Sequence, residues 1–409
     1  MKKGYLSQYF EGVAVKRLSS VEINIDASNQ HELNGVSKIK SLLGSDDKRF
    51  DTKFLWIGGE DNCFSECGEV TWYDARRNHP TRSEYRLYFK NNSVMFQASK
   101  GDLLFLAKTR NDELIIVIAP EHSTFENQLL WLFNVEDPAF WLNYKTVDGK
   151  NDTELSFAVR YILEELEIEV ELPDADRLDS IIEPYLETGF PSTAEFSRLA
   201  RESVGQLDYI NEPDVSIMKW LDEEEKLFKR LEKHIVYDRL KKGFYEDGVT
   251  DVEGFIQFSL SVQNRRKARA GRSIENHIEA MLKKHQVKYS RGAVTEHKSE
   301  PDFLFPGISY YNNESFPVSD LTMLGVKSTC KDRWRQVLAE ARKIDEKHLF
   351  TIEPGISEHQ TDEMAYNKLQ LVIPKPLHET YKAAQCGWLM DFEFFLQLTK
   401  ERQRKHYID

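Results

Sequence analysis

Two stretches in the second half of the chain, PDFLFPG (301–307) and MLGVKSTCKDRWRQVLAEARKI (323–344), decide how this half is expected to fold. Both contain short apolar runs typical of strands, and the second continues into apolar residues at helical spacing, which predicts a helix from about 332 to 345. Two further strands are expected at HLFTI (348–352) and LQLVIP (369–374). Strands that alternate with helices indicate an α/β domain with a mixed central sheet.

These stretches contain three charged residues that the expected fold would bring close together. Asp302 precedes the first strand, Lys327 lies among uncharged residues of the second, and Glu340 lies at the rim of the apolar stripe of the expected helix. The strand advances by roughly 13 Å and the helix returns by roughly 12 Å, so Glu340 is expected at the level of Lys327. Two carboxylates and an amine suit Mg²⁺ binding and phosphodiester hydrolysis. The alternative is a structural role for each residue: Asp302 in a turn, Lys327 on the surface of a strand, and Glu340 in an ion pair along its helix.

Basic residues surround this group although the whole chain is acidic. The formal net charge is −13, which alone argues against binding a phosphate polymer, yet residues 261–300 contain ten Lys and Arg against four Glu. Such a basic island indicates phosphate binding, and a solvated helix face is the alternative. In KDRWR (331–335), alternating cations and an acid fit the donors and acceptors of G·C pairs in the major groove.

The composition is that of an ordinary globular protein. Its 409 residues suggest two to three domains, each with its own core. No apolar segment is long enough for a signal peptide or a membrane span, so we expect a cytoplasmic protein without a membrane partner. The four cysteines do not have the spacing of a zinc site or a disulfide framework, so they are expected to be reduced.

The first half of the chain is expected to be mostly β, as a barrel or sandwich. Helical patterns occur there only at 33–44 and at 123–135, where Ser123 is the expected cap. The expected strands are VAVKRL (13–18), VEINID (21–26), TKFLWIG (52–58), EVTWYD (69–74), YRLYF (85–89), SVMFQAS (93–99), DLLFLAK (102–108) and ELIIVIA (113–119).

An acidic segment divides the two halves. Residues 161–187 contain ten acids against Arg177, and we interpret them as a linker between a first domain at 1–160 and a second at 188–409. The second domain is expected to begin with helices. Their patterns lie at FSRLARESVGQL (196–207), at 216–244, at VEGFIQFSLSVQNRRKA (252–268) and in a separately capped helix from Ser273 to His285.

The second half resembles the catalytic domain of EcoRII-type restriction endonucleases, which belong to the PD-(D/E)xK nuclease superfamily. The shared stretches are SVQNRRKARAGRSIE, PDFLFP, FPVSDLTMLGVKSTCKDRWRQVLAEARKI and HLFTIEPGIS, within a similarity over roughly 190–385. The resemblance implies that Asp302, Lys327 and Glu340 are catalytic, that Asp302 and Glu340 hold Mg²⁺, and that Glu275 is an additional helix carboxylate. It also implies that Lys331, Asp332 and Arg333 read a CC/GG core. The residues that it implies flank the DNA are Asn264, Arg265, Arg266, Lys267 and Arg269.

The first half more faintly resembles the effector-binding domain of the same enzymes, a B3-like pseudobarrel that grips DNA with two arms. VAVKRLSS (13–20) resembles one arm and WYDARRNHPTRSEYR (72–86) the other, although loop lengths and sequences differ. Ordinary surface loops are the alternative interpretation. The DNA contacts that this resemblance implies are Lys16, Arg17, Tyr73, Asp74, Arg76, Arg77, Arg82 and Arg86.

These observations and resemblances together predict a two-domain, Mg²⁺-dependent type II restriction endonuclease that cuts double-stranded DNA at a G·C-flanked site such as CCWGG. A DNA-binding regulator with an inactive nuclease module, or a repair-type nuclease of the same fold, is the alternative. Cutting both strands favours a homodimer that pairs helices between 215 and 260, with a monomer as the alternative. We also hypothesise that the first domain and the acidic segment restrain the nuclease until effector DNA binds.

Overall fold

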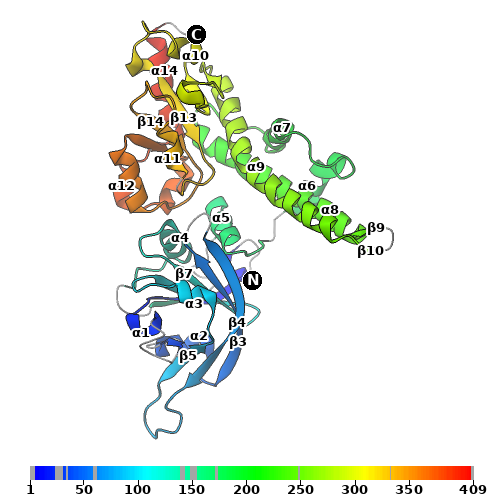
Figure 1. The fold of residues 1–409 in the computed structure, drawn as a ribbon, viewed down its shortest axis with the longest axis vertical. Coiled ribbons are helices and arrows are strands. Elements are labelled where there is room, and N and C mark those ends of the chain that lie inside the picture. The colour runs from blue at the N-terminus through cyan, green and yellow to red at the C-terminus, as the bar shows by residue number, and fades with distance from the viewer. Residues whose placement is uncertain are drawn as a thin grey trace. The chain divides into compact units, whose positions relative to one another are not determined.

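The computed structural model describes residues 5–23, 31–33, 36–58, 62–138, 143–147, 154–170, 174–246, 249–331 and 333–406. The chain divides into two compact units, each with a sheet of its own (Figure 1). Unit 1 is Met1–Glu171 with Pro354–Gln360, and unit 2 is Leu172–Glu353 with Thr361–Asp409. None of the helices in the described part of the chain combines the length and the apolar character that crossing a membrane requires.

Unit 1 is built on one eight-stranded sheet with the order β2-β5-β4-β3-β7-β6-β1-β8. The β3–β7 pair is parallel and all other neighbours are antiparallel. This sheet agrees with the prediction that the first half is mostly β. The strands are β1 (Phe10–Arg17), β2 (Glu32–Leu33), β3 (Lys48–Ile57), β4 (Cys63–Asp74), β5 (Tyr85–Phe89), β6 (Leu103–Thr109), β7 (Leu114–Ala119) and β8 (Asn143–Thr146).

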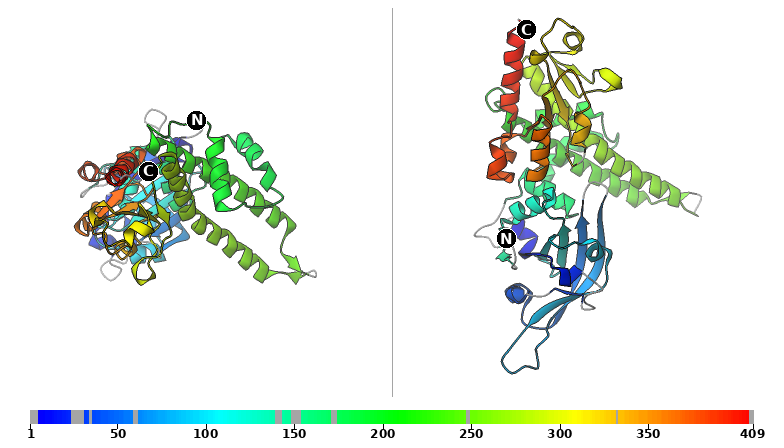
Figure 2. Two further views of the ribbon diagram at one scale, coloured as in Figure 1. Left: turned by 90° about the horizontal axis from the view of Figure 1, so that it is seen from above. Right: turned by 60° about the vertical axis from the view of Figure 1, so that its left-hand side comes forward.

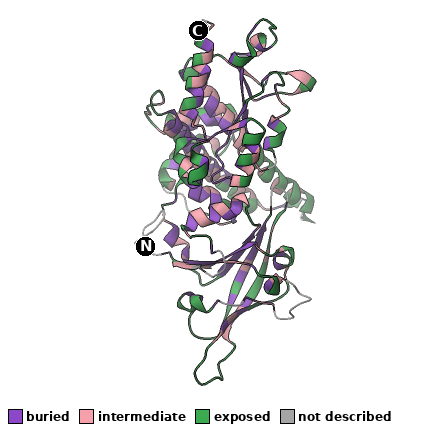
Figure 3. Ribbon diagram, turned by 90° about the vertical axis from the view of Figure 1, so that its left-hand side faces the viewer, coloured by how far each residue is buried: buried purple, intermediate pink, exposed green. Residues whose placement is uncertain are grey.

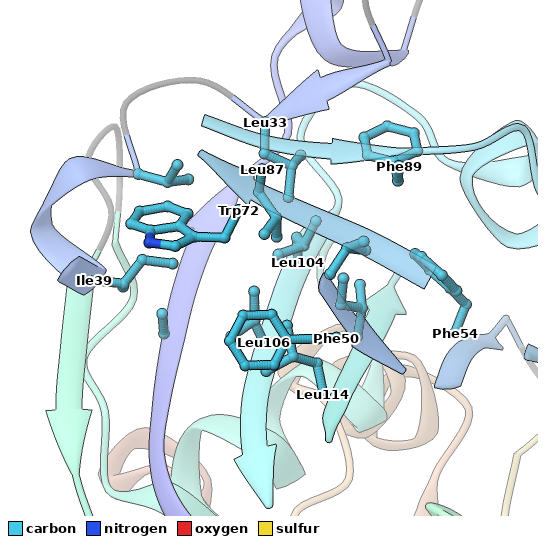
Figure 4. Close-up of a cluster of buried hydrophobic side chains, with 14 of the residues drawn as sticks. Leu33, Ile39, Phe50, Phe54, Trp72, Leu87, Phe89, Leu104, Leu106 and Leu114 are labelled. Carbon is cyan, nitrogen blue, oxygen red and sulfur yellow. The ribbon is translucent and has the colours of Figure 1, made fainter. Parts of the chain in front are cut away.

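Both faces of this sheet are buried, which explains the unbroken apolar run of β7. Leu114 and Ile116 belong to one cluster of buried side chains, which also contains Trp72 and part of which Figure 4 shows. Ile115 and Val117 belong to the other cluster. The first cluster is covered by η2 (Ser37–Ile39), α2 (Lys40–Leu43) and α3 (Ser93–Gln97), and the second by α4 (Thr124–Phe133) and α5 (Phe157–Glu165). The chain of unit 1 also forms η1 (Leu6–Gln8) and α1 (Ser20–Ile23).

Two expected strands of unit 1 are helices. Ser93–Gln97 is α3 because the side chain of Asn92 accepts a hydrogen bond from the Met95 amide and caps the first turn. Ser20–Ile23 is α1, and the rest of the expected strand at 21–26 lies outside the described residues. The helix predicted at 123–135 is confirmed as α4, with Ser123 as its cap.

The segment 161–187 differs from the linker that its charge suggested. It contains the end of α5, then α6 (Ala175–Ile182) and η3 (Glu183–Tyr185), and the division between the units falls inside it. Apolar residues at helical spacing explain the difference, since Ile162 is buried in the core of unit 1 and Leu178 in unit 2. Of the acidic residues in this segment, Glu164 and Glu165 lie on α5, and Asp176 and Asp179 lie on α6.

Unit 2 contains a five-stranded sheet with the order β11-β12-β13-β14-β15. β11, β12 and β13 are antiparallel, whereas β13, β14 and β15 are parallel. The prediction of a mixed central sheet is therefore confirmed. The strands are β11 (Ser290–Arg291), β12 (Phe303–Phe305), β13 (Thr322–Val326), β14 (Lys347–Phe350) and β15 (Leu369–Val372).

Helices make up most of the rest of unit 2, and a long helical hairpin extends from its sheet (Figures 1 and 2). The hairpin is α8 (Pro213–Lys242) and α9 (Val252–Lys284), joined through the short strands β9 (Tyr245–Glu246) and β10 (Val249–Thr250). The other elements are α7 (Thr193–Ser203), η4 (Glu296–Lys298), α10 (Ile308–Tyr311), η5 (Val318–Asp320), α11 (Trp334–Val337), η6 (Lys375–Thr380), α13 (Ala383–Cys386), α14 (Phe392–Arg404) and α12 (Glu358–Tyr366), which belongs to unit 2 from Thr361 onward.

The separate helix expected from Ser273 to His285 is wrong, because α9 continues through this point without a break. Gly271 does not adopt a positive φ, and Ser273 is buried inside the helix. Glycine therefore does not end the helix here, and the part of the basic island up to Lys284 lies on one continuous α-helix, whose buried residues there include Ile274 and Ile278.

Replacing Gly271 with alanine should stabilise the protein by about 0.5–1 kcal/mol, because glycine is unfavourable inside a helix. An added Cβ at Gly271 meets no atom within 4 Å. Thermal and urea unfolding of G271A would measure the change. A loss of stability would contradict a continuous helix, because alanine is disfavoured only where glycine closes a helix in the left-handed conformation.

Candidate active site

Asp302 and Lys327 lie together at one end of the antiparallel pair β12–β13. Asp302 comes one residue before β12 and Lys327 one residue after β13, which is a correction to the expectation that the lysine lies within the strand. Phe303 pairs with Leu324, which sets this register. The Asp302 Oδ2 atom accepts a hydrogen bond from the Val326 amide (2.6 Å) and lies 3.6 Å from the Lys327 Nζ atom.

Glu340 reaches this place through tight turns rather than through the long helix expected at 332–345. The helix α11 ends at Val337, and the amide of Glu340 then donates to the Val337 carbonyl (3.1 Å), an i→i−3 bond. Ala341 has a left-handed φ of 42°, which an α-helix excludes. The expected apolar stripe is nevertheless buried at Trp334, Val337, Ala341 and Ile344.

Gly325 in the middle of β13 lets this turn segment approach the sheet. An added Cβ at Gly325 would lie 3.0 Å from both Cγ atoms of Val337. Because a side chain at this position would push Val337 away by a few tenths of an ångström, the glycine allows the segment before Glu340 to pack closely against β13. The close packing brings Glu340 within electrostatic reach of both Asp302 and Lys327.

Glu340 is a half-buried carboxylate whose Oε2 atom is buried and has no hydrogen-bond partner among the described residues. Burial is the main reason that the pKa of Glu340 rises to about 7, and the negative charge of Asp302 acts in the same direction. Lys327 and Lys347 oppose this rise in the pKa. The structure thus brings the three residues of the predicted site together as one interacting group.

The donor set fits a hard divalent cation. A buried carboxylate oxygen without a hydrogen-bond partner, next to a second carboxylate, is what a bound cation would satisfy. Across the described ranges, no group of three or more His, Cys, Asp or Glu has the arrangement of a metal site. Mg²⁺ does not require such a group, because it keeps several waters and is bound in many enzymes by one or two carboxylates and substrate phosphates.

Glu275, expected as an additional carboxylate of this site, forms an ion pair with Arg291. The Arg291 guanidinium on β11 lies 2.8 Å from Glu275 and 2.7 Å from Glu279, both on α9. The next residue, Gly292, donates its amide to the Asp302 carbonyl (3.1 Å). Arg291 therefore ties α9 to the strand beside Asp302. No motif marks this arginine in the sequence, where it is one of ten cations of the basic island.

Several cations in the part of the basic island that lies on α9 are neutralised by acids or packed against aromatic rings. Arg265 lies over the ring of Phe190 (4.7 Å), and Arg266 pairs with Glu232 at 2.5 Å. Arg269 lies 4.2 Å from the ring centre of Phe228 and 4.0 Å from Glu224. The exposed members of the predicted flanking set are Asn264, Arg266 and Lys267.

Two of the predicted base-reading residues, Lys331 and Arg333, follow Lys327 closely, and the Arg333 amide donates to the Cys330 carbonyl (2.8 Å). Lys331 has a left-handed φ of 29°, and Arg333 is exposed directly before α11. Asp332 lies outside the described residues. Arg335, two residues further, pairs with Glu363 at 2.8 Å.

Most of the predicted DNA contacts in unit 1 have acidic or backbone partners inside the unit. Arg17 lies 2.6 Å from both Glu126 and Asp137, and Arg86 lies 2.7 Å from Glu32. The remaining partners are Glu22 for Lys16, Glu84 for Arg76, Asp47 for Arg77, Glu32 for the Tyr73 hydroxyl, and the Arg76 and Glu84 amides for Asp74.

Arg82 differs from the other cations of this set. It is exposed in the connection between β4 and β5 and forms no ion pair with any residue in the described part of the chain. The sequence did not distinguish Arg82 from its neighbours, because several of the acids that pair with the others, such as Glu126 with Arg17 and Asp47 with Arg77, lie far away along the chain.

Parts of this chain are similar to known proteins. Residues 228–396 match the family model described as EcoRII C terminal. The type II restriction enzyme EcoRII of Escherichia coli is 40% identical to this chain over 210 residues, 51% of this chain and 50% of that protein. The chain thus spans about half the length of the curated relative that it matches.

Solved structures with a similar arrangement include two restriction-enzyme complexes. Metal-depleted Ecl18kI with uncleaved, modified DNA has a TM-score of 0.46 and 21% identity, over 57% of this chain and 86% of that chain. The PspGI–substrate DNA complex has a TM-score of 0.43 and 15% identity, over 54% of this chain and 96% of that chain. The resemblance of the second half to EcoRII-type restriction endonucleases is confirmed by the family model, which spans Asp302, Lys327 and Glu340.

Proposed function

We propose that this chain is a Mg²⁺-dependent type II restriction endonuclease that cuts double-stranded DNA. The observation that carries the proposal is the buried Glu340 oxygen without a hydrogen-bond partner, beside Asp302 and Lys327, inside the segment that matches the EcoRII C-terminal model. The restriction enzyme EcoRII, 40% identical over the matched part, supports the same reaction class. The paired state of Glu275 favours a metal site of two carboxylates rather than three.

Asp302 and Glu340 would hold the metal, with water and phosphate oxygens completing its ligands. Bound Mg²⁺ would supply positive charge at the scissile phosphate and lower the pKa of an attacking water. The Lys327 ammonium group, held near Asp302 by their 3.6 Å ion pair, offsets charge on the phosphorane or positions the water. Burial around Glu340 strengthens each of these electrostatic interactions by excluding solvent.

For sequence recognition we propose the turn at 331–333. Lys331 and Arg333 would donate to guanine O6 and N7, while Asp332 would accept from cytosine N4. A site with G·C pairs on both flanks, such as CCWGG, fits this set. The exposure of Arg333 directly before α11 supports its access to a major groove.

We propose that unit 1 is a B3-like domain that binds DNA as an effector or second recognition element. Its mostly β sheet and the exposed Arg82 between β4 and β5 support a DNA-binding arm at 72–86. The ion pairs of the other candidate cations favour a structural role for them before DNA binds. Restraint of the nuclease by this domain stays a prediction.

We further propose that two copies pair through the helical hairpin, so that both strands are cut. The outer part of α8 and α9 is rich in exposed residues (Figure 3). Its exposed apolar side chains would be covered in such a dimer. They are Tyr237, Leu240, Tyr245, Val249, Val252, Phe255, Ile256 and Leu260.

Replacing Lys327 with alanine should reduce DNA cleavage at least about a hundredfold, as expected if its charge contributes roughly 3 kcal/mol to the transition state. Plasmid cleavage in Mg²⁺ measures the loss, and the matched control is K368A, which removes an exposed lysine that lies 3.8 Å from Asp345. A K327A protein that cuts at the wild-type rate would refute the assignment of this lysine.

Replacing Glu340 with glutamine should abolish cleavage and yet stabilise the metal-free protein at pH 8. Folded Glu340 keeps its proton up to about pH 7, whereas the unfolded chain releases it near 4.5, so its stability contribution falls as pH rises between these values. E340Q removes this penalty, about 1–2 kcal/mol after allowance for solvent screening. Unfolding in EDTA at pH 8 and pH 5 tests it. An equal stability change at both pH values would contradict the raised pKa.

The variants R82A and R17A should separate DNA binding from stability in unit 1. R82A should leave the melting temperature unchanged and reduce the slope of log Kd against log salt by about 1, the value for one lost phosphate contact. R17A should destabilise the protein by roughly 2–3 kcal/mol, because it leaves the buried Glu126 without its cation. Salt-dependent binding and thermal unfolding measure both. Unchanged binding by R82A would count against this arm.

A further inference from the structure

A short connection, here called the turn at 327–333, leads from the proposed catalytic lysine to Lys331 and Arg333, two of the proposed base-reading residues. At its start, the Lys327 amide donates to the Phe350 carbonyl (3.0 Å), which continues the pairing of β13 with β14. At its end, the amides of Arg333 and Trp334 donate to the Cys330 carbonyl (2.8 and 3.2 Å) and start α11. A contact that holds Cys330 in place therefore also sets the distance between Lys327 and the base-reading residues.

Glu353 holds the middle of this turn. Its side chain accepts a hydrogen bond from the Cys330 amide, and Glu353 and Cys330 are only 3% and 0% exposed. A carboxylate that accepts from a backbone amide forms a charge-assisted bond, about twice as strong as a neutral one. A buried charge is tolerated only where such bonds compensate its lost hydration.

The backbone of Glu353 is itself held by two hydrogen bonds. Its amide donates to the Thr351 hydroxyl (3.2 Å), and its carbonyl accepts from the Tyr381 hydroxyl (2.6 Å). The Thr351 hydroxyl also contacts the Ser328 carbonyl at 3.4 Å. Two residues that follow β14, Thr351 and Glu353, thus hold the turn after Lys327 at Ser328 and at Cys330.

We propose that Glu353 is a positioning residue that couples base recognition to catalysis. Its carboxylate fixes Cys330, and through Cys330 it sets Lys331 and Arg333 on one side and Lys327 on the other. When Lys331 and Arg333 contact a matched base pair, Lys327 stays in place. When they contact a mismatched pair, both Lys327 and the base-reading residues are displaced. This inference rests on the proposed nuclease function. It adds the residue through which binding of the correct DNA sequence increases the rate of cleavage.

Asp214 provides a matched control within the same unit. It is also buried, at 5% exposed, and accepts from the backbone amides of Lys375, Phe392 and Glu393 at 2.8–2.9 Å. Its partners lie in or next to η6 and α14, and none of them belongs to the turn at 327–333. Losing the Asp214 carboxylate should weaken the fold without altering the geometry of the turn.

The test compares E353A, E353Q and D214N with the wild type in the full chain. Single-turnover cleavage is measured on the site that the wild type cuts, identified by sequencing the cut ends, and on sites with one flanking G·C pair replaced. DNA binding is measured in Ca²⁺, and folding by thermal unfolding.

We expect E353A to cut its own site about a hundredfold more slowly and to lose most of its discrimination between matched and substituted sites. E353Q keeps an acceptor oxygen without the charge, so its rate should fall about tenfold. D214N should be less stable yet retain the wild-type rate and discrimination. If E353A does not fold, the E353Q comparison with D214N decides.

The outcomes separate the two proposals. A wild-type protein that does not cut DNA in Mg²⁺ overturns the proposed function. A wild type that cuts, with E353Q matching D214N in rate and discrimination, overturns the role of Glu353 alone. A slower E353Q with unchanged discrimination between sites would also overturn it, because a merely structural role changes the rate on every site equally.

Discussion

The burial of one carboxylate next to another is the constraint on which the candidate site depends. Folding places Glu340 where water is largely excluded and where the charge of Asp302 opposes its ionisation, so that its pKa rises to about 7. Lys327 compensates only part of this cost, and one Glu340 oxygen has no hydrogen bond among the residues that the structure describes. A fold that keeps such a group sacrifices stability, which is characteristic of sites whose remaining partner is a ligand.

The sheet of unit 2 supplies the rigid frame for this group. The antiparallel step from β12 to β13 brings Asp302 and Lys327 to one end, and the parallel step to β14 fixes the lysine backbone. Gly325 allows the turns before Glu340 to lie on the strand. Arg291 and Glu353 then connect this centre to α9 and to the turn at 331–333, the two segments proposed to contact DNA.

Apolar patterning was sufficient to predict the larger elements. The run LIIVIA, the Ser123 cap and the alternation of strands and helices after 300 all correspond to observed elements. The failures have local causes. Asn92 caps a helix where β-rich residues suggested a strand, and Ala341 turns out of the helix expected around Glu340. The resemblance named Glu275, but the sequence does not reveal its ion pair with Arg291, which comes from a different strand. Glu353 carries no motif, because its partner is a backbone amide 23 residues away.

A crystal structure of the full chain with cleavable DNA and Ca²⁺ tests the central claim most directly. We expect one Ca²⁺ ion bound by oxygens of both Asp302 and Glu340, at about 2.3–2.6 Å, together with a phosphate oxygen of the DNA. An ion held elsewhere on the chain, or carboxylates of Asp302 and Glu340 too far apart to share one cation, would contradict it.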